Sequence, residues 1–110
     1  SLFQANAGIQ DVVLPREMGN RRFAPIAESL YENTAVQSLD LENCGITGRE
    51  GGEIIRLLLL NNQSITKLDL TGNHHLGPEG VASIAQALRD DRCVLNELLL
   101  WKCGIGNEGF

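Results

Sequence analysis

Three cysteines are the most reactive side chains of this 110-residue chain, and they first raise the possibility of thiol chemistry. Cys44, Cys93 and Cys103 are an odd number without the paired spacing of a disulfide framework or zinc site, which favours a reducing compartment. Cys44 and Cys103 occupy equivalent positions of units two apart, as shown below, so they lie about 10 Å from each other. A disulfide needs Cα atoms within about 7 Å. We therefore expect packed thiols rather than a redox or metal site.

The adjacent pair His74–His75 could bind a metal, because imidazole is a common zinc ligand. No Cys, Asp or Glu accompanies the pair at ligand spacing, so a surface turn is the simpler interpretation. The glycines Gly45, Gly48, Gly51 and Gly52 form no phosphate loop, since the Lys-Ser/Thr that completes one is missing. No nucleophile with a nearby base can be proposed either. We predict that the chain is not an enzyme and holds no metal or cofactor.

The charge and hydrophobicity of the chain restrict the classes of partner that it can bind. The net charge of −5 argues against nucleic acid, which needs a basic stripe, and permits a basic protein partner. Residues Ser1–Gln10 show no signal peptide, and no apolar run approaches the roughly 18 residues that span a bilayer. The expected location is the cytoplasm.

A short strand pattern recurs along the chain. Ile65, Leu68 and Leu70 alternate as in a strand, and Asn73 and Leu76 follow in a turn. The same pattern returns at Val36–Ile46 and Leu95–Ile105, with a degenerate copy at Ile9–Leu14. Its second leucine recurs as Leu41, Leu70 and Leu100, spaced by 29 and then 30 residues. The chain is therefore predicted to be built from repeats.

The segments between these strands repeat more strictly, at 29 residues, and carry helical spacing. The equivalent positions are Phe23, Gly52 and Val81; Ile26, Ile55 and Ile84; Leu30, Leu59 and Leu88; and Asn33, Asn62 and Asp91. Ile26 and Leu30 are four apart, so they share one helix face. The Asn or Asp three residues later is expected to end each helix in a left-handed conformation.

The pattern Leu-x-x-Leu-x-Leu-x-x-Asn/Cys-x-Leu resembles that of leucine-rich repeats. The 28–29-residue period, the helix in every unit and the alternation of Cys44, Asn73 and Cys103 resemble the ribonuclease-inhibitor-like subclass, which also forms the arrays of nucleotide-binding immune receptors. The resemblance covers about Ile9 to Phe110. Pro15 and Glu17 depart from it, so the first turn is expected to be irregular, and His74–His75 brings an extra residue.

The resemblance implies an α/β solenoid, with parallel strands on a concave face and helices on a convex face. Repeated strand–helix order agrees with it, because it gives parallel strands and one continuous core. Residues 1–110 then form a single domain of about three full repeats with partial units at both ends. Leu2–Ile9 matches Leu58–Ile65, Gly109–Phe110 falls where a helix should start, and neither end carries a polar cap. We therefore expect a fragment of a longer array.

Equivalent strand positions form columns on the concave face. One column is Val13, Asp40, Asp69 and Leu99, and the next is Pro15, Glu42, Thr71 and Trp101. Asp40 and Asp69 are predicted to lie about one strand spacing apart, with Glu42 beside them. Such carboxylates repel one another unless a cation or basic partner meets them. The face is either a site for a basic protein surface or a solvated polar surface.

Trp101 is the only tryptophan, and the pattern points it outward on the concave face. Exposed Trp is enriched in binding hot spots, although a following repeat could instead cover it. The candidate partner-binding residues are Asp40, Glu42, Lys67, Asp69, Glu97, Trp101 and Lys102. On the convex side, Ile54, Leu57 and Leu58 match mostly polar positions of other repeats. They are expected to form a small exposed apolar patch, either a lateral interface or an adjustment of helix packing.

The favoured function is a non-catalytic module that binds a protein partner through the concave strand face. Within this class, the resemblance suggests an inhibitor of a basic enzyme or the sensing array of an immune receptor. One alternative is a structural piece of a larger assembly, which could self-associate through its ends or through Ile54, Leu57 and Leu58. Another is the substrate-recognition array of a larger enzyme.

Overall fold

A computed structural model describes residues 10–106, which form three strand–helix repeats and a fourth strand. The elements, in chain order, are β1 (Asp11–Val13), α1 (Gly19–Ser29), β2 (Ser38–Asp40), α2 (Gly48–Asn61), β3 (Lys67–Asp69), α3 (Gly77–Leu88) and β4 (Glu97–Leu99). The predicted alternation of strands and helices is confirmed. The matches drawn for Leu2–Ile9 and Gly109–Phe110 lie outside the described residues.

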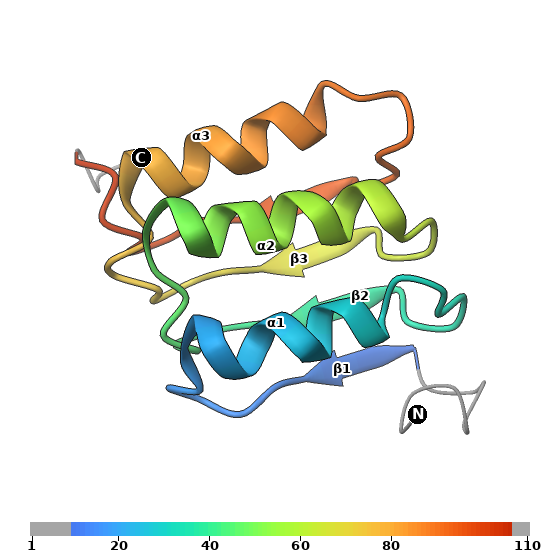
Figure 1. Ribbon diagram of the computed structural model, residues 1–110, viewed down its shortest axis with the longest axis horizontal. Coiled ribbons are helices and arrows are strands. Elements are labelled where there is room, and N and C mark those ends of the chain that lie inside the picture. Colours follow the sequence, from blue (N-terminus) through green and yellow to red (C-terminus); the bar gives the residue numbers. More distant parts are fainter. Residues whose placement is uncertain (1–9, 107–110) are drawn as a thin grey trace.

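The four strands form one parallel sheet in the order β1-β2-β3-β4. The helices lie in a single layer on one side of the sheet, and its other side carries no helix within residues 10–106 (Figure 1). This is the predicted α/β arrangement, because each of β1, β2 and β3 is followed by a helix that returns the chain to the start of the next strand.

The core lies between sheet and helices, and leucines fill it in columns. Leu39 of β2 pairs in register with Leu68 of β3, and both are fully buried. Leu98, their neighbour in β4, is only partly buried, because no described strand lies beyond β4. Leu88 shows the same effect among the helices: it is 44% exposed, whereas the equivalent Leu30 and Leu59 are buried.

Two buried asparagines bond one repeat to the repeat before it. Asn73 donates to the carbonyls of Leu41 and Leu70, at 3.0 and 2.7 Å, and its side-chain oxygen accepts the backbone N–H groups of Cys44 and Ile46. Buried turns need such partners, because an unpaired backbone group in the interior is costly.

Asn62 makes the corresponding set behind α2. It donates to the carbonyls of Leu30 and Asn33 and accepts from the backbone N–H groups of Ser64 and Ile65. The expectation of a left-handed helix end here was wrong, since Asn62 is extended at φ −116° and ψ 134°. Its role is hydrogen bonding.

The left-handed residues lie instead in the turns after the strands, and one of them is the first residue of each described helix. Gly19, Gly48, Gly77 and Gly106 are 29 residues apart and all have φ between +60° and +88°. Only glycine adopts such a φ without a steric cost. This column explains where the chain turns from strand to helix, and its 29-residue spacing is visible in the sequence.

The helices are not evenly packed. Gly52 of α2 faces Gly80 of α3 so closely that an added Cβ would stand 2.7 Å from the Gly80 Cα, so the two backbones touch. At the position equivalent to Gly52, α1 carries the fully buried Phe23. In Figure 1, α2 accordingly lies nearer to α3 than to α1.

The expected convex patch is mostly wrong. Leu58 is fully buried, Ile54 packs partly buried against the core, and only Leu57 is exposed, at 41%. Leu58 is three residues from the buried Ile55, so the two share a helix face. The comparison misled because the equivalent Ala87, taken as outward, is itself buried.

The first turn is irregular, as expected, but its backbone still hydrogen-bonds to the turn of the second repeat. Glu17 has φ 59°, yet its N–H bonds the Asn43 carbonyl at 2.7 Å. The extra residue at His74–His75 is absorbed, because α3 begins directly after the buried Leu76, whereas α2 begins two residues after the equivalent Ile46.

No helix in residues 10–106 has the length and apolar content to cross a bilayer.

Candidate functional site

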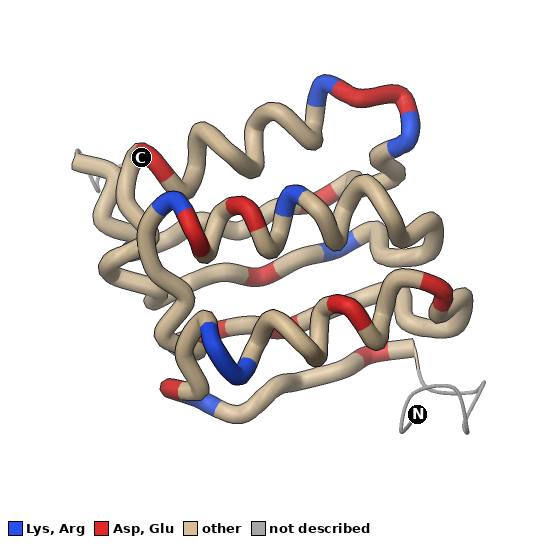
Figure 2. The backbone as a smooth tube through the Cα atoms, in the orientation of Figure 1, with Lys and Arg blue, Asp and Glu red and all other residues tan. Residues whose placement is uncertain are grey.

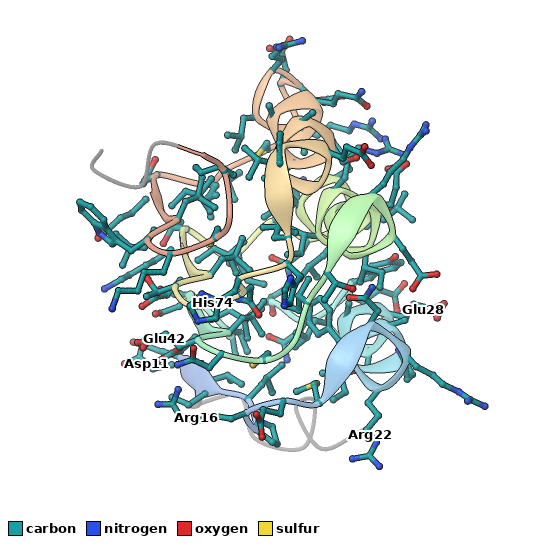
Figure 3. All side chains as sticks on the ribbon, turned by 90° about the vertical axis from the view of Figure 1, so that its left-hand side faces the viewer. Asp11, Arg16, Arg22, Glu28, Glu42 and His74 are labelled. Carbon is teal, nitrogen blue, oxygen red and sulfur yellow. The ribbon has the colours of Figure 1, made fainter. Side chains whose placement is uncertain are left out.

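The helix-free face of the sheet carries the predicted acidic group. Asp40 and Asp69 are direct neighbours across β2 and β3, and Glu42 follows two residues after Asp40. One carboxylate oxygen from each of the three lies within 4.8 Å of the others. We call these residues the acidic trio. Figure 2 shows acidic positions on the strands, and Figure 3 shows Glu42 on the side of the sheet that faces away from the helices.

Backbone bonds hold two of these carboxylates in place. Asp40 accepts the N–H of Glu42 and Asp69 accepts the N–H of Thr71, each at 2.9 Å. The same side chain–backbone bond in successive repeats sets both aspartates at one height on the face. The arrangement is therefore a product of the repeat itself.

The trio is electrostatically strained. The pKa of Glu42 is raised above its ordinary value, first by the charge of Asp69, then by the charge of Asp40 and by a hydrogen bond with Asp69. Arg16 acts in the opposite direction and lowers it. An approaching cation relieves this repulsion, because it favours the ionised form of all three groups.

The trio offers oxygens to a hard cation, but only three ligands. Calcium takes six to eight oxygens. All three carboxylates are partly exposed, which is also the ordinary state of surface acids. Their geometry suits a lysine or arginine side chain at least as well as a metal ion.

Apolar side chains flank the trio on both sides. Val13 of β1 is 73% exposed at one end of the Asp40–Asp69 column, and the partly buried Leu99 of β4 stands at the other. Trp101, in the turn after β4, is 53% exposed. The face therefore runs from apolar to acidic to apolar across the four strands.

The remaining candidate residues border this face. Lys67 and Glu97 are exposed and pair in register across β3 and β4. Lys102, beside Trp101, is exposed in a left-handed turn at φ 56°. All seven residues predicted from the sequence thus come from three adjacent repeats, on strands β2 to β4 and the turns after them.

The cysteines are packed thiols. Cys44 is a free, fully buried thiol whose sulfur donates to the Pro15 carbonyl at 3.2 Å, and burial raises its pKa to about 11. Cys103 is fully buried and donates to the Leu70 carbonyl at 3.1 Å. Both occupy the column in which Asn73 makes its bonds, so they serve the same structural purpose. Cys93 is a partly buried free thiol.

The histidines occupy a surface turn, as predicted. His74 and His75 are both exposed, and neither belongs to a group of three potential metal ligands among residues 10–106. Sequence comparison missed that they line a hollow together with Arg16 of the first repeat. Arg16 gave no signal, because its turn departs from the repeat pattern.

Known proteins share this repeat pattern. A family model described as "Leucine Rich repeat" matches residues 61–85. The human "NACHT, LRR and PYD domains-containing protein 5" is 36% identical over 86 residues, which are 77% of this chain and 7% of that protein. The mouse "Ribonuclease inhibitor" is 38% identical over 74 residues, 67% of this chain and 16% of that protein. The mouse "NACHT, LRR and PYD domains-containing protein 12" is 32% identical over 107 residues, 96% of this chain and 10% of that protein. The chain thus spans less than a fifth of these relatives.

Proposed function

Because the chain belongs to the leucine-rich-repeat proteins, in the ribonuclease-inhibitor-like subclass, we propose that it is a non-catalytic module that binds a protein partner. The partner lies along the helix-free face of the sheet. The observation that carries this proposal is the trio of mutually repelling carboxylates held there between exposed apolar side chains. An open strip without an enclosed pocket suits a protein surface better than a small substrate.

The chemistry of the face favours a basic partner. A lysine or arginine set between Asp40 and Asp69 would relieve their repulsion and lower the pKa of Glu42. Trp101 would supply apolar contact at the rim and carry a large share of the binding energy. Lys67, Glu97 and Lys102 would contribute to orientation and association rate, as charges at a rim do.

Parallel affinity capture tests this proposal. The wild-type chain, Asp40→Lys/Asp69→Lys and Trp101→Ala are used as bait, and retained proteins are quantified by mass spectrometry. Leu57→Ala, on the helix side, is the matched control. We expect one set of proteins to fall about tenfold or more with both concave-face variants, which corresponds to about 1.4 kcal/mol or more of binding energy, and to persist with Leu57→Ala.

Retention of the same proteins by all three variants would overturn the concave-face proposal. Thermal melting of each bait shows whether a variant loses its partners only because it unfolds. Trp101 is exposed, so its removal should leave the fold intact. A melting collapse in Trp101→Ala would show instead that this side chain supports the core.

A second function is favoured by a separate observation, the apolar edge at the last repeat. Leu88 is 44% exposed, and Leu98 and Leu100 are partly buried where the equivalent leucines of β2, β3 and the turns after them are fully buried. A structural piece of a larger assembly would pack through this edge. If Leu98→Lys loses the captured proteins while Asp40→Lys/Asp69→Lys retains them, this alternative is selected.

The relatives bear on the wider context. They are six or more times longer than the matched segment, which supports the proposal that this unit works within a longer array. The buried thiols fit a reducing compartment, and the cytoplasm is the proposed location.

A further inference from the structure

A hollow of about 730 Å³ opens at the edge of the molecule where the strands end and the helices begin. Turns of three successive repeats line it: Arg16 and Glu17 from the first, residues around Asn43 and Thr47 from the second, and His74 and His75 from the third. Figure 3 looks onto this edge, with Arg16 and His74 labelled.

The hollow arises from unequal loops. The connection from β1 to α1 covers residues 14–18, whereas those from β2 to α2 and from β3 to α3 cover residues 41–47 and 70–76. The first turn is shorter by two residues, which leaves space over the second turn. The third turn has the same length as the second and carries the two imidazoles of His74 and His75.

The lining is rich in hydrogen-bond donors. When the Asn43 amide nitrogen donates to the Gly72 carbonyl, at 3.2 Å, the amide oxygen accepts one N–H of Arg16, at 2.7 Å. This bond positions the guanidinium, whose other N–H groups stay available. Both imidazoles are exposed in the opposite turn. Glu17 is the single acid among the lining residues.

The helix starts lie at the same edge. Thr47, the N-cap residue of α2, is among the lining residues, whereas no residue of α3 is. The first N–H of α2, that of Gly48, already donates to the His75 carbonyl at 2.8 Å. The acidic trio, by contrast, lies on the sheet face beside the hollow, and none of its members lines it.

We propose that this hollow is a binding site for an oxyanion, a phosphate or a carboxylate group. Arg16 makes the charge-assisted contact, and Asn43 holds its guanidinium in position. His74 and His75 donate from the far side. The site lies at the loop edge and borders the acidic trio, since the charge of Arg16 acts on Glu42, whereas the partner proposed above lies on the strand face.

Amide NMR of the labelled chain tests the site, with sodium phosphate added at constant ionic strength. We expect saturable shifts confined to the turns around Gly45, Gly72 and His74, and roughly tenfold weaker binding in Arg16→Gln, as loss of a charge-assisted contact predicts. His74→Asn should also weaken binding. Arg89→Gln removes an exposed arginine outside the hollow and should change nothing. A parallel titration with acetate separates a phosphate site, which acetate leaves unshifted, from a general oxyanion site.

Linear, non-saturating shifts, or equal phosphate affinity in the wild type and Arg16→Gln, would overturn the proposal. Trp101→Ala should bind phosphate as the wild type does. Failure of this site and failure of the strand-face function are therefore observed in different experiments.

Discussion

Gly52 of α2 packs against the backbone of Gly80 in α3, with no room for a side chain between them. This is the closest approach that the glycines make between two helices of the described chain. It places α2 and α3 together and leaves α1, with Phe23 at the equivalent position, farther away. The convex layer is therefore tight on one side of α2 and looser on the other.

Gly52→Ala tests this contact. The added methyl would overlap Gly80 and push the helices apart, so we expect the free energy of unfolding to fall by about 1–3 kcal/mol, as for overpacked cores. Urea unfolding followed by circular dichroism measures the change. Arg49→Ala, an exposed position on the same helix, is the control and should stay within about 0.5 kcal/mol. Equal stabilities of the two variants would contradict the close contact.

Asn73→Ala tests the bonds between repeats. The substitution leaves two N–H groups and two carbonyls without their side-chain partner in the interior. Each buried unpaired group costs about 1–3 kcal/mol, partly recovered by relaxation. We expect a loss of at least about 2 kcal/mol in urea unfolding. Asn61→Ala, which removes a single exposed bond to the Leu57 carbonyl, serves for comparison and should cost far less.

Asp69→Asn tests the repulsion within the acidic trio. The amide oxygen can still accept the Thr71 N–H, but the first cause of the raised pKa of Glu42 is gone. We expect the Glu42 pKa, followed by carboxyl-carbon NMR, to fall toward its ordinary value.

The same variant should change the pH dependence of stability. A raised folded pKa means that Glu42 favours the folded state most below its unfolded value, 4.5, and that this contribution is lost as the pH rises through the folded pKa. The Tm of Asp69→Asn should therefore exceed that of the wild type by more at pH 7 than at pH 4. Glu97→Gln, an exposed acid outside the trio, should give no such difference. Equal gains at both pH values would show that the trio is screened by solvent.

Thiol labelling tests the assignment of the cysteines. With a pKa of about 11 and a fully buried sulfur, Cys44 should stay protonated and unreactive at pH 8. Cys93, the partly buried thiol, should react first with a disulfide reagent. Cys93→Ser should remove the fast phase and leave labelling that requires unfolding. Labelling of Cys44 at the rate of Cys93 would be incompatible with the packed site described here.

The periodic features were predictable from the sequence, because equivalent residues of stacked repeats meet equivalent surroundings. The 29-residue spacing of Leu41 and Leu70 placed the strands, and counting outward from these leucines placed Asp40 beside Asp69. The exposure of Trp101 followed from the same count. Burial was predicted correctly for side chains whose exposure depends only on their position within the repeat.

What was missed depends on neighbours that differ between repeats. Leu58 and the equivalent Ala87 are both buried where α2 packs closely against α3, whereas the equivalent Ser29 of the more distant α1 is only partly buried. Asn62 was correctly expected at the end of α2, but its conformation was missed, since it is extended and bonds backward to the preceding repeat rather than turning left-handed. The hollow beside Arg16 needs a short loop and a long loop in adjacent turns, and no single column records that combination.

The reach of the asparagine bonds limits how such a chain can lengthen. Asn62 and Asn73 contact only their own repeat and the one immediately before it. A tandem duplication of one whole unit would thus keep each strand leucine in register with the leucines beside it. It would also place Asn73 next to a second copy of itself, in a column where it now stands between Cys44 and Cys103. Each added unit would bring the asparagine bonds that attach it to the unit before it.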